Sequence, residues 1–163
     1  MAIWQYNVSL IPLINFDKNY LEFIKQEDSD YLKSTECFWN ETFVNKNEIE
    51  LKIDEFITDQ KSISNNFLYW KGDTSNFYDN DCSIGFDEND NINFFNFRFD
   101  LRNEINIIQS IDLLIEIAQE YHLKFTNVKY VFFEAEKELF IENIHQSNGF
   151  KFLEDPEKFL ENL

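Results

Sequence analysis

The start of the chain alternates between apolar and polar positions, which predicts a β-strand over residues 3–11. Its apolar face carries Trp4, Tyr6, Val8 and Leu10, and its polar face carries Gln5, Asn7 and Ser9. Pro12 then interrupts the ladder, because proline has no backbone N–H to donate. We therefore expect a first strand with one face turned toward a core.

A hairpin in the middle of the chain is the clearest local unit. Residues 82–86 alternate, residues 87–91 form a polar turn, and residues 92–101 return as a long strand. In the return strand the apolar positions change from even to odd numbers, which predicts a β-bulge near Phe94 and Phe95. The apolar positions are Cys82, Ile84 and Phe86, then Ile92 and Phe94, then Phe95, Phe97, Phe99 and Leu101.

Helices are predicted where apolar residues recur at helical spacing beside capping residues. A short helix is expected over residues 17–26, and a second one opens with Asn47 as N-cap and Glu50 three positions on. Asn103 caps a long helix over residues 104–121, with Ile108, Ile111, Ile115 and Ala118 on its buried face. Further elements are strands over residues 67–70 and 128–133, a helix over residues 138–147 followed by Gly149, and a last short helix from Asp155 and Pro156.

This order of elements favours an α+β fold, with one antiparallel or mixed β-sheet and helices packed on it. The 163 residues include 44% apolar residues and 19 Phe, which is enough for a single globular domain over residues 1–163. Residues 1–6 resemble no secretory signal, and no window approaches about 20 apolar residues, so we expect a cytoplasmic protein without a membrane partner. Cys37 and Cys82 are then expected to be reduced core residues.

The residues that usually carry chemistry are scarce. Three glycines leave no phosphate-binding loop or dinucleotide fingerprint, and neither cysteine forms a catalytic signature with His122 or His145. The run that starts at Asp79 begins like a calcium loop, but Ile84 occupies the position that needs glycine. We therefore expect no enzyme, no cofactor and no metal site, although an unrecognised pair of carboxylates remains an alternative.

Charge gives the strongest functional signal. The chain has a net charge of −17, and between Lys71 and Lys124 it holds eleven acidic residues against Arg98 and Arg102. Such a field repels nucleic acid and anionic membranes and attracts basic proteins. Aromatic anchors within a charged rim are typical of binding hot spots. The sequence thus predicts a surface for a basic protein partner made of Asp73, Phe77, Tyr78, Asp79, Asp81, Asp87, Glu88 and Asp90.

Several segments have a familiar pattern: residues 4–6, 10–12, 97–102, 143–147, 151–152 and 155–160. Together they resemble small cytoplasmic immunity proteins encoded beside bacterial polymorphic or contact-dependent toxins. The resemblance implies a protein that is not an enzyme and that blocks one cognate toxin domain, for example a nuclease with a basic cleft. It transfers no functional residues. An alternative with the same charge is a nucleic-acid mimic that inhibits a DNA-binding protein.

Overall fold

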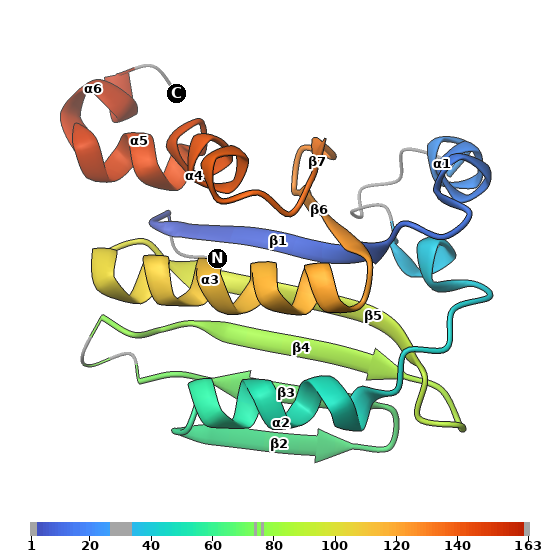
Figure 1. Cartoon of the computed structure of the whole chain (residues 1–163). Helices are drawn as coiled ribbons and strands as arrows, with labels where there is room; N and C mark the ends of the chain where they lie inside the picture. The colour runs from blue at the N-terminus through green and yellow to red at the C-terminus, as the bar shows by residue number, and fades with distance from the viewer. Residues whose placement is uncertain (1–2, 27–33, 74, 76, 162–163) are drawn as a thin grey trace.

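A seven-stranded antiparallel sheet forms the centre of the computed structural model, which describes residues 3–26, 34–73, 75 and 77–161 (Figure 1). The strand order is β2-β3-β4-β5-β1-β6-β7, so the hairpin strands and the first strand lie in the middle. The predicted α+β class is confirmed. The strands are β1 (Gln5–Pro12), β2 (Gln60–Ser64), β3 (Phe67–Lys71), β4 (Asp81–Phe86), β5 (Ile92–Asp100), β6 (Leu123–Asn127) and β7 (Phe132–Phe133).

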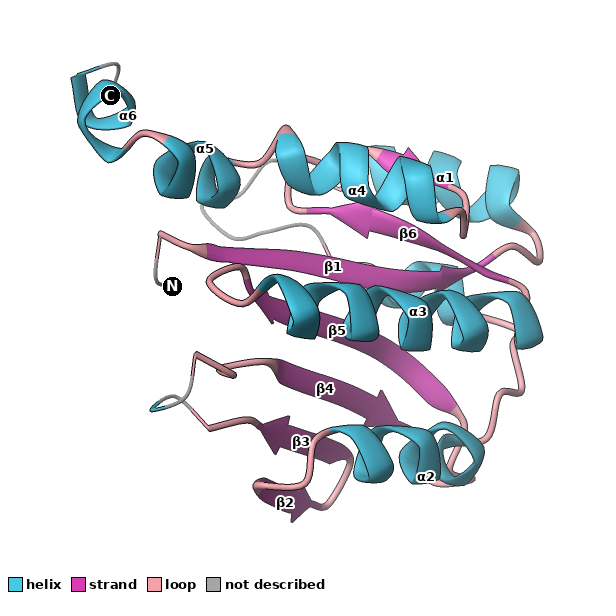
Figure 2. Cartoon of the chain, turned by 60° about the vertical axis from the view of Figure 1, so that its left-hand side comes forward, coloured by secondary structure: helices cyan, strands magenta, loops and turns pink. Residues whose placement is uncertain are grey.

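Three helices cover one face of the sheet, as Figure 2 shows from the side. They are α2 (Lys46–Phe56), α3 (Glu104–Glu120) and α4 (Lys137–His145). The main core lies between them and the sheet, because the inward side chains of the central strands and of these helices form one buried cluster. The remaining helices are α1 (Phe16–Ile24), η1 (Glu36–Trp39), α5 (Asn148–Glu154) and α6 (Pro156–Glu161).

The alternation in β1 and β5 places their side chains as the sequence predicts. Tyr6 is opposite Phe99 and Val8 is opposite Phe97, and all four side chains are buried in the main core. The predicted bulge is present one position earlier: Gly85 pairs with Phe94 and Phe86 pairs with Ile92, so the extra residue is Asn93. The parity of β5 changes there, and Arg98 and Asp100 consequently lie on the opposite face from Phe97 and Phe99.

A smaller aromatic cluster lies on that opposite face, at one end of the sheet. Ile11 of β1 packs there with Phe23 of α1 and with Cys37 and Phe38 of η1. The ring of Phe132 lies 5.7 Å from the ring of Phe38, which ties β7 to the same cluster. Both cysteines are free and buried, as expected. Cys37 belongs to this smaller cluster, and Cys82 belongs to the main core.

Two helix predictions need correction. The N-cap of α2 is Asn45, whose Oδ1 accepts a hydrogen bond from the Asn47 N–H at 3.0 Å, so the predicted Asn47 cap is wrong. Asn103 does cap α3, but the helix is rotated, and Ile108 is exposed. The rotation arises because Asn106 and Ser110 turn inward to accept the two N–H bonds of the buried Asn80 side chain at 2.9 and 3.0 Å.

Three further segments differ from the sequence prediction. Strand β2 was missed, because its five residues are all exposed and show no apolar alternation. The strand expected over residues 128–133 is wrong except at Phe132 and Phe133, which form β7; β6 ends at Asn127, and a turn follows in which the Asn127 side chain accepts the N–H groups of Lys129 and Val131. Gly149 lies inside α5 and does not end a helix there, and the position favours glycine because a Cβ would lie 3.0 Å from the Gln5 carbonyl oxygen.

Candidate functional site

The residues predicted to bind a partner fall into two groups at opposite ends of β4 (Figure 1). One group precedes the strand, in the loop after β3, and the other forms the turn between β4 and β5. Six residues of strand separate their ends by about 17–20 Å. The first group is Asp73, Phe77, Tyr78, Asp79 and Asp81, and the second is Asp87, Glu88 and Asp90. The structure does not bring these eight residues into one patch.

Asp79 and Asp81 belong to a charge network with Lys71 and Arg98. The Lys71 ammonium lies 2.8 Å from Asp79 and 3.4 Å from Asp81, and Arg98 also pairs with both carboxylates. Asp79 and Asp81 are buried, and Asp79 also accepts a hydrogen bond from the Gln5 side chain. Two carboxylates and two cations cancel, so these acids contribute little field to the surface.

Asp100 and Arg102 extend this arrangement toward the predicted aromatic anchor. The Arg102 guanidinium donates to both Asp100 oxygens, at 2.8 and 2.5 Å, and lies 4.8 Å from the Trp4 ring and 4.7 Å from the Phe77 ring. Burial raises the pKa of Asp100, but the bonds from Arg102 and from the Asp79 N–H outweigh it and hold the pKa below its usual range. Phe77 is thus exposed while it stacks on a cation of its own chain.

The other loop residues are also engaged within the fold. Tyr78 is half-buried, its ring lies 6.3 Å from the Phe56 ring, and burial followed by the charge of Asp59 raises its pKa. Asp73 accepts the Ser75 N–H at 2.8 Å, which shapes the loop. The loop is therefore attached to the end of α2 by Tyr78.

At the other end of β4, the residues of the hairpin tip, 87–90, mostly shape the turn. Asp87 accepts the N–H groups of Asn91 and Asn89 at 2.9 and 2.8 Å, and these bonds lower its pKa. Asp90 lies in the left-handed backbone region and pairs with Lys46 at 3.5 Å. Glu88 remains exposed.

A larger acidic region lies on the outer sides of α2 and α3, and none of its residues is among the eight that the sequence predicts for partner binding. We call it the α2–α3 surface. Lys52 joins the two helices by ion pairs to Glu116 at 2.6 Å and Glu120 at 3.0 Å, so they are direct neighbours. Lys137 from α4 pairs with Asp112 at 2.6 Å. The exposed carboxylates of this surface are Glu48, Glu55, Glu104, Asp112, Glu116 and Glu120.

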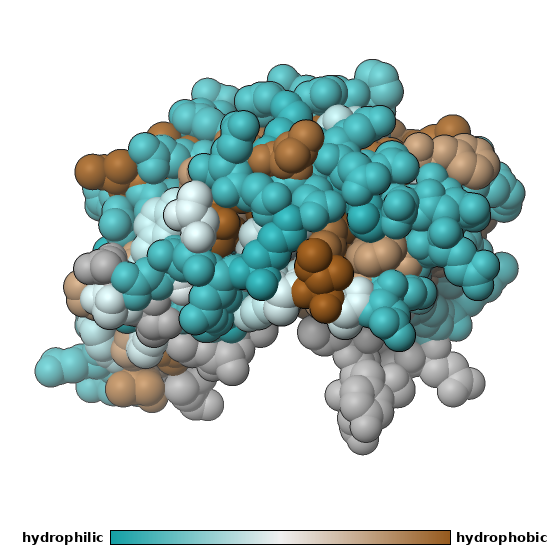
Figure 3. All heavy atoms as spheres, turned by 90° about the horizontal axis from the view of Figure 1, so that it is seen from below, coloured by the Kyte–Doolittle hydropathy of each residue, from teal (hydrophilic) through white to brown (hydrophobic). Residues whose placement is uncertain are grey.

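Apolar side chains are exposed on the same two helices. Leu51 is 67% exposed and Ile105 is 73% exposed, although each lies within a regular helix. Figure 3 looks onto the edge formed by β2 and α2 and shows hydrophilic side chains over most of it, with isolated apolar ones between. The sequence predicts aromatic anchors within a charged rim for the β3–β4 loop, whereas the exposed apolar residues of the α2–α3 surface are the aliphatic Leu51 and Ile105.

Both cysteine thiols are buried, and both histidines lie at or just after the end of a helix. Burial raises the pKa of the Cys37 and Cys82 thiols, which disfavours the reactive thiolate. His122 is exposed just after α3, and His145 stacks on Phe150 with ring centroids 4.4 Å apart. Within the described ranges, no group of three or more His, Cys, Asp or Glu residues is placed to hold a metal ion. None of the described helices is long and apolar enough to cross a bilayer.

Comparisons of the chain with protein-family models, with curated proteins and with solved structures found no match.

Proposed function

We propose that this protein is an immunity-type inhibitor that binds a basic toxin domain through the α2–α3 surface. The observation that carries the proposal is the arrangement of six exposed carboxylates on two adjoining helices, where Lys52 and Lys137 are the only described residues that form ion pairs with them. Glu55 and Glu104 have no ion-pair partner among the described residues. This region therefore presents more uncompensated negative charge than the loop around Asp79.

The charge has a direct consequence for binding. Carboxylates grouped on one face steer a basic partner into the correct encounter and raise its association rate, most strongly at low salt. A nuclease that binds phosphates through lysine and arginine offers such a basic surface. An acidic protein that covers the basic cleft competes with the substrate for the same cations.

Leu51 and Ile105 supply the short-range part of the interaction. Steering charges at a rim mainly change the association rate, whereas a buried apolar side chain mainly slows dissociation. Each side chain now exposes most of its area to water, and that area would be buried against a partner. We expect Leu51→Ala to raise the dissociation rate and to leave the association rate nearly unchanged.

Binding kinetics with the toxin domain encoded next to this gene test the proposal at two ionic strengths. In the test variant, Glu48, Glu55 and Glu116 are changed to Lys. The matched control changes Glu22, Glu36 and Glu154 to Lys, which alters the net charge equally with exposed residues outside the α2–α3 surface. We expect the test variant to associate at least about tenfold more slowly at low salt, and the control to change much less.

Two results would contradict the proposal. If the wild-type protein does not bind the neighbouring toxin domain, the inhibitor function is wrong. If the two triple variants slow association equally, net charge acts without a defined surface and the assignment to α2 and α3 is wrong. The partner surface predicted from the sequence is tested in the same assay. The variant Asp73→Lys with Glu88→Lys changes two acids of that surface that are accessible to solvent.

A further inference from the structure

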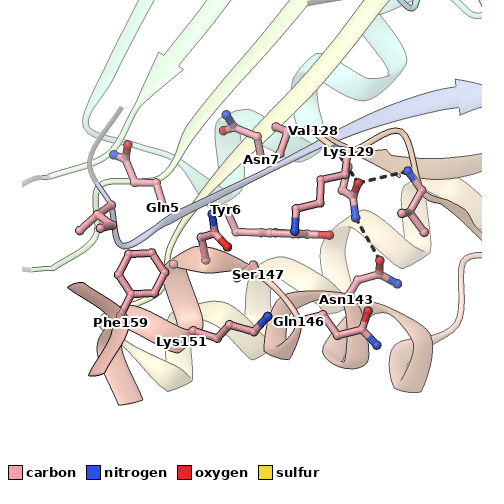
Figure 4. Close-up of a pocket in the computed structure, with 15 residues that line it drawn as sticks. Gln5, Tyr6, Asn7, Val128, Lys129, Asn143, Gln146, Ser147, Lys151 and Phe159 are labelled. Carbon is pink, nitrogen blue, oxygen red and sulfur yellow. Dashed lines mark hydrogen bonds between the residues drawn. The ribbon is translucent and has the colours of Figure 1, made fainter. Parts of the chain in front are cut away.

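A cavity of about 550 Å³ lies between the first half of β1, the turn after β6 and the last three helices (Figure 4). It exists because β6 pairs with β1 only from Val8 onward, while α5 packs against the β1 backbone at Gln5 through Gly149. The space between these two contacts stays open. Its volume lies within the range of sites that hold small molecules.

The charge of this cavity is opposite to that of the protein. Among the described residues no Asp or Glu lines it, although the chain has 31 acidic residues, and the two charged residues in that lining are Lys129 and Lys151. Neither lysine forms an ion pair with a described residue, whereas Lys46, Lys52 and Lys61 each pair with two carboxylates. Figure 4 shows Lys129 entering from the β6–β7 turn and Lys151 from α5, both directed toward the cavity.

A buried hydroxyl without a hydrogen bond is part of the same wall. Tyr6 is only 4% exposed, and its hydroxyl has no well-formed hydrogen-bond partner among the described residues. Burial raises its pKa, and the nearby Asn127 side chain opposes that effect. A buried polar group in a native protein normally has a partner, so an orphaned hydroxyl at a cavity wall marks the place of a missing one.

Two amides beside Tyr6 are held in fixed positions. The Asn127 oxygen accepts the Lys129 N–H at 2.9 Å, and its NH₂ group donates to the Asn143 oxygen at 3.2 Å. The Asn143 NH₂ group in turn donates to the Leu139 carbonyl at 2.9 Å. Side chains locked in this way form a preorganised binding wall.

An adjoining hollow of about 340 Å³ repeats the pattern. It shares Asn7, Asn127 and Val128 with the first cavity, and its lining likewise includes no Asp or Glu from the part of the chain that the structure describes. Thr126 is 2% exposed and Thr35 is 6% exposed, and the structure gives neither hydroxyl a partner among the described residues. Tyr6 thus borders the first cavity, and Thr35 and Thr126 border the adjoining hollow.

We propose that the cavity binds a small organic anion, with its carboxylate or phosphate facing Lys129 and Lys151 and a hydrogen-bonding group reaching the Tyr6 hydroxyl. The anion requirement follows from two lysines that form no ion pair with a described residue, in a wall whose described residues include no carboxylate. The requirement for a hydrogen-bonding group follows from the orphaned hydroxyl. The site is separate from the α2–α3 surface, so its occupancy and the binding of a toxin are independent claims.

Titration calorimetry with the full chain at low salt tests the site with three probes: citrate, adenosine 5′-monophosphate and inorganic phosphate. We expect citrate or the nucleotide to bind saturably with a Kd below about 1 mM, and inorganic phosphate to bind at least about tenfold more weakly. The better of the two organic probes distinguishes a carboxylate site from a phosphate site. Backbone amide shifts at Asn127, Asn143 and Gly149 should saturate with the same Kd.

Variants separate this site from general attraction between charges. Lys129→Ala with Lys151→Ala should weaken the organic probe at least about tenfold, and Lys25→Ala, a change of an exposed lysine outside the cavity, should leave it unchanged. Tyr6→Phe should weaken binding severalfold but leave Tm nearly unchanged, because it removes a hydroxyl that makes no well-formed hydrogen bond within the described part of the protein. Absence of binding by both organic probes overturns the proposal. If inorganic phosphate binds as tightly as the organic probes, the site holds an adventitious ion only, and the proposal is overturned too.

Discussion

The charge network around Arg98 and the α2–α3 surface use carboxylates in opposite ways. In the network, Asp79 and Asp81 are buried and share Lys71 and Arg98. On the α2–α3 surface the carboxylates are exposed, and they outnumber the lysines that form ion pairs with them. The first arrangement stabilises a loop, and the second leaves charge available to another molecule. A high density of acidic residues along a sequence therefore does not locate a binding surface. The ion pairs formed in the folded protein decide which carboxylates keep an uncompensated charge.

Strand β5 separates the two regions, so a change in its core side chains should disturb both. Phe99 is fully buried between Tyr6 and Phe140, with ring centroids 6.0 and 5.4 Å away. We expect Phe99→Ala to cost about 3–5 kcal/mol of unfolding free energy through lost burial and a residual cavity. Chemical denaturation measures it. A cost within about 0.5 kcal/mol would contradict the packing described for β5.

The network should depend strongly on its arginine. Arg98→Met leaves Asp79 and Asp81 with Lys71 alone, and we expect a loss of about 2–3 kcal/mol, because buried charges that lose a partner are costly. Adding Asp81→Asn removes one of the orphaned charges. The double variant should then lose less unfolding free energy than the sum of the losses of the two single variants. A double-mutant cycle measured by chemical denaturation tests this. Simple additivity would mean that the two side chains do not interact.

Asp100 should make stability depend on acid pH. Its pKa is lowered in the folded protein, so its contribution is complete above its ordinary pKa and is lost as the pH falls through the folded value. Asp100→Asn should cost about 2 kcal/mol at pH 7, because it weakens charged bonds to Arg102. The difference between variant and wild type should shrink from about pH 5 to about pH 2. A difference that is constant with pH would contradict the lowered pKa.

The smallest expected effect concerns the cation of the α2–α3 surface. Lys52→Ala removes an exposed ion-pair partner of Glu116 and Glu120, and we expect a stability change below about 1 kcal/mol. The surface becomes more negative, so association with a basic partner should become a few times faster at low salt. Stopped-flow mixing at two ionic strengths measures this. Slower association would show that Lys52 itself contacts the partner.

The parts of the fold that follow local rules could be predicted from the sequence. Strand β1, the β4–β5 hairpin and the Asn103 cap of α3 each have an apolar period or a capping residue that is decisive over a few positions. The bulge at Asn93 could be inferred to within about one residue from the change of parity in β5. The rotation of α3 could not, because it depends on Asn80, which is 26 residues before Asn106.

The candidate sites were harder to predict for the same reason. Asp79 and Asp81 look like exposed loop acids in the sequence, and only the fold brings Arg98 beside them. The walls of the β1–α5 cavity come from segments more than 100 residues apart, and amide side chains such as Asn127 and Asn143 are common in this chain. The two cavity lysines, Lys129 and Lys151, play no role in the predicted acidic surface. The other lysines of the chain share this property, so it does not locate the cavity.

Strand β2 has a consequence for the behaviour of the protein in concentrated solution. It is an edge strand, and an exposed edge can pair with the edge of another copy and start aggregation. Here the edge sequence is short and polar, and Lys61 lies in it, bound to Glu50 and Asp54 at 2.5 and 2.7 Å. A second copy would have to desolvate that lysine and break both ion pairs to add a strand. The seven-stranded sheet is thereby protected against polymerisation at the end where it would otherwise grow.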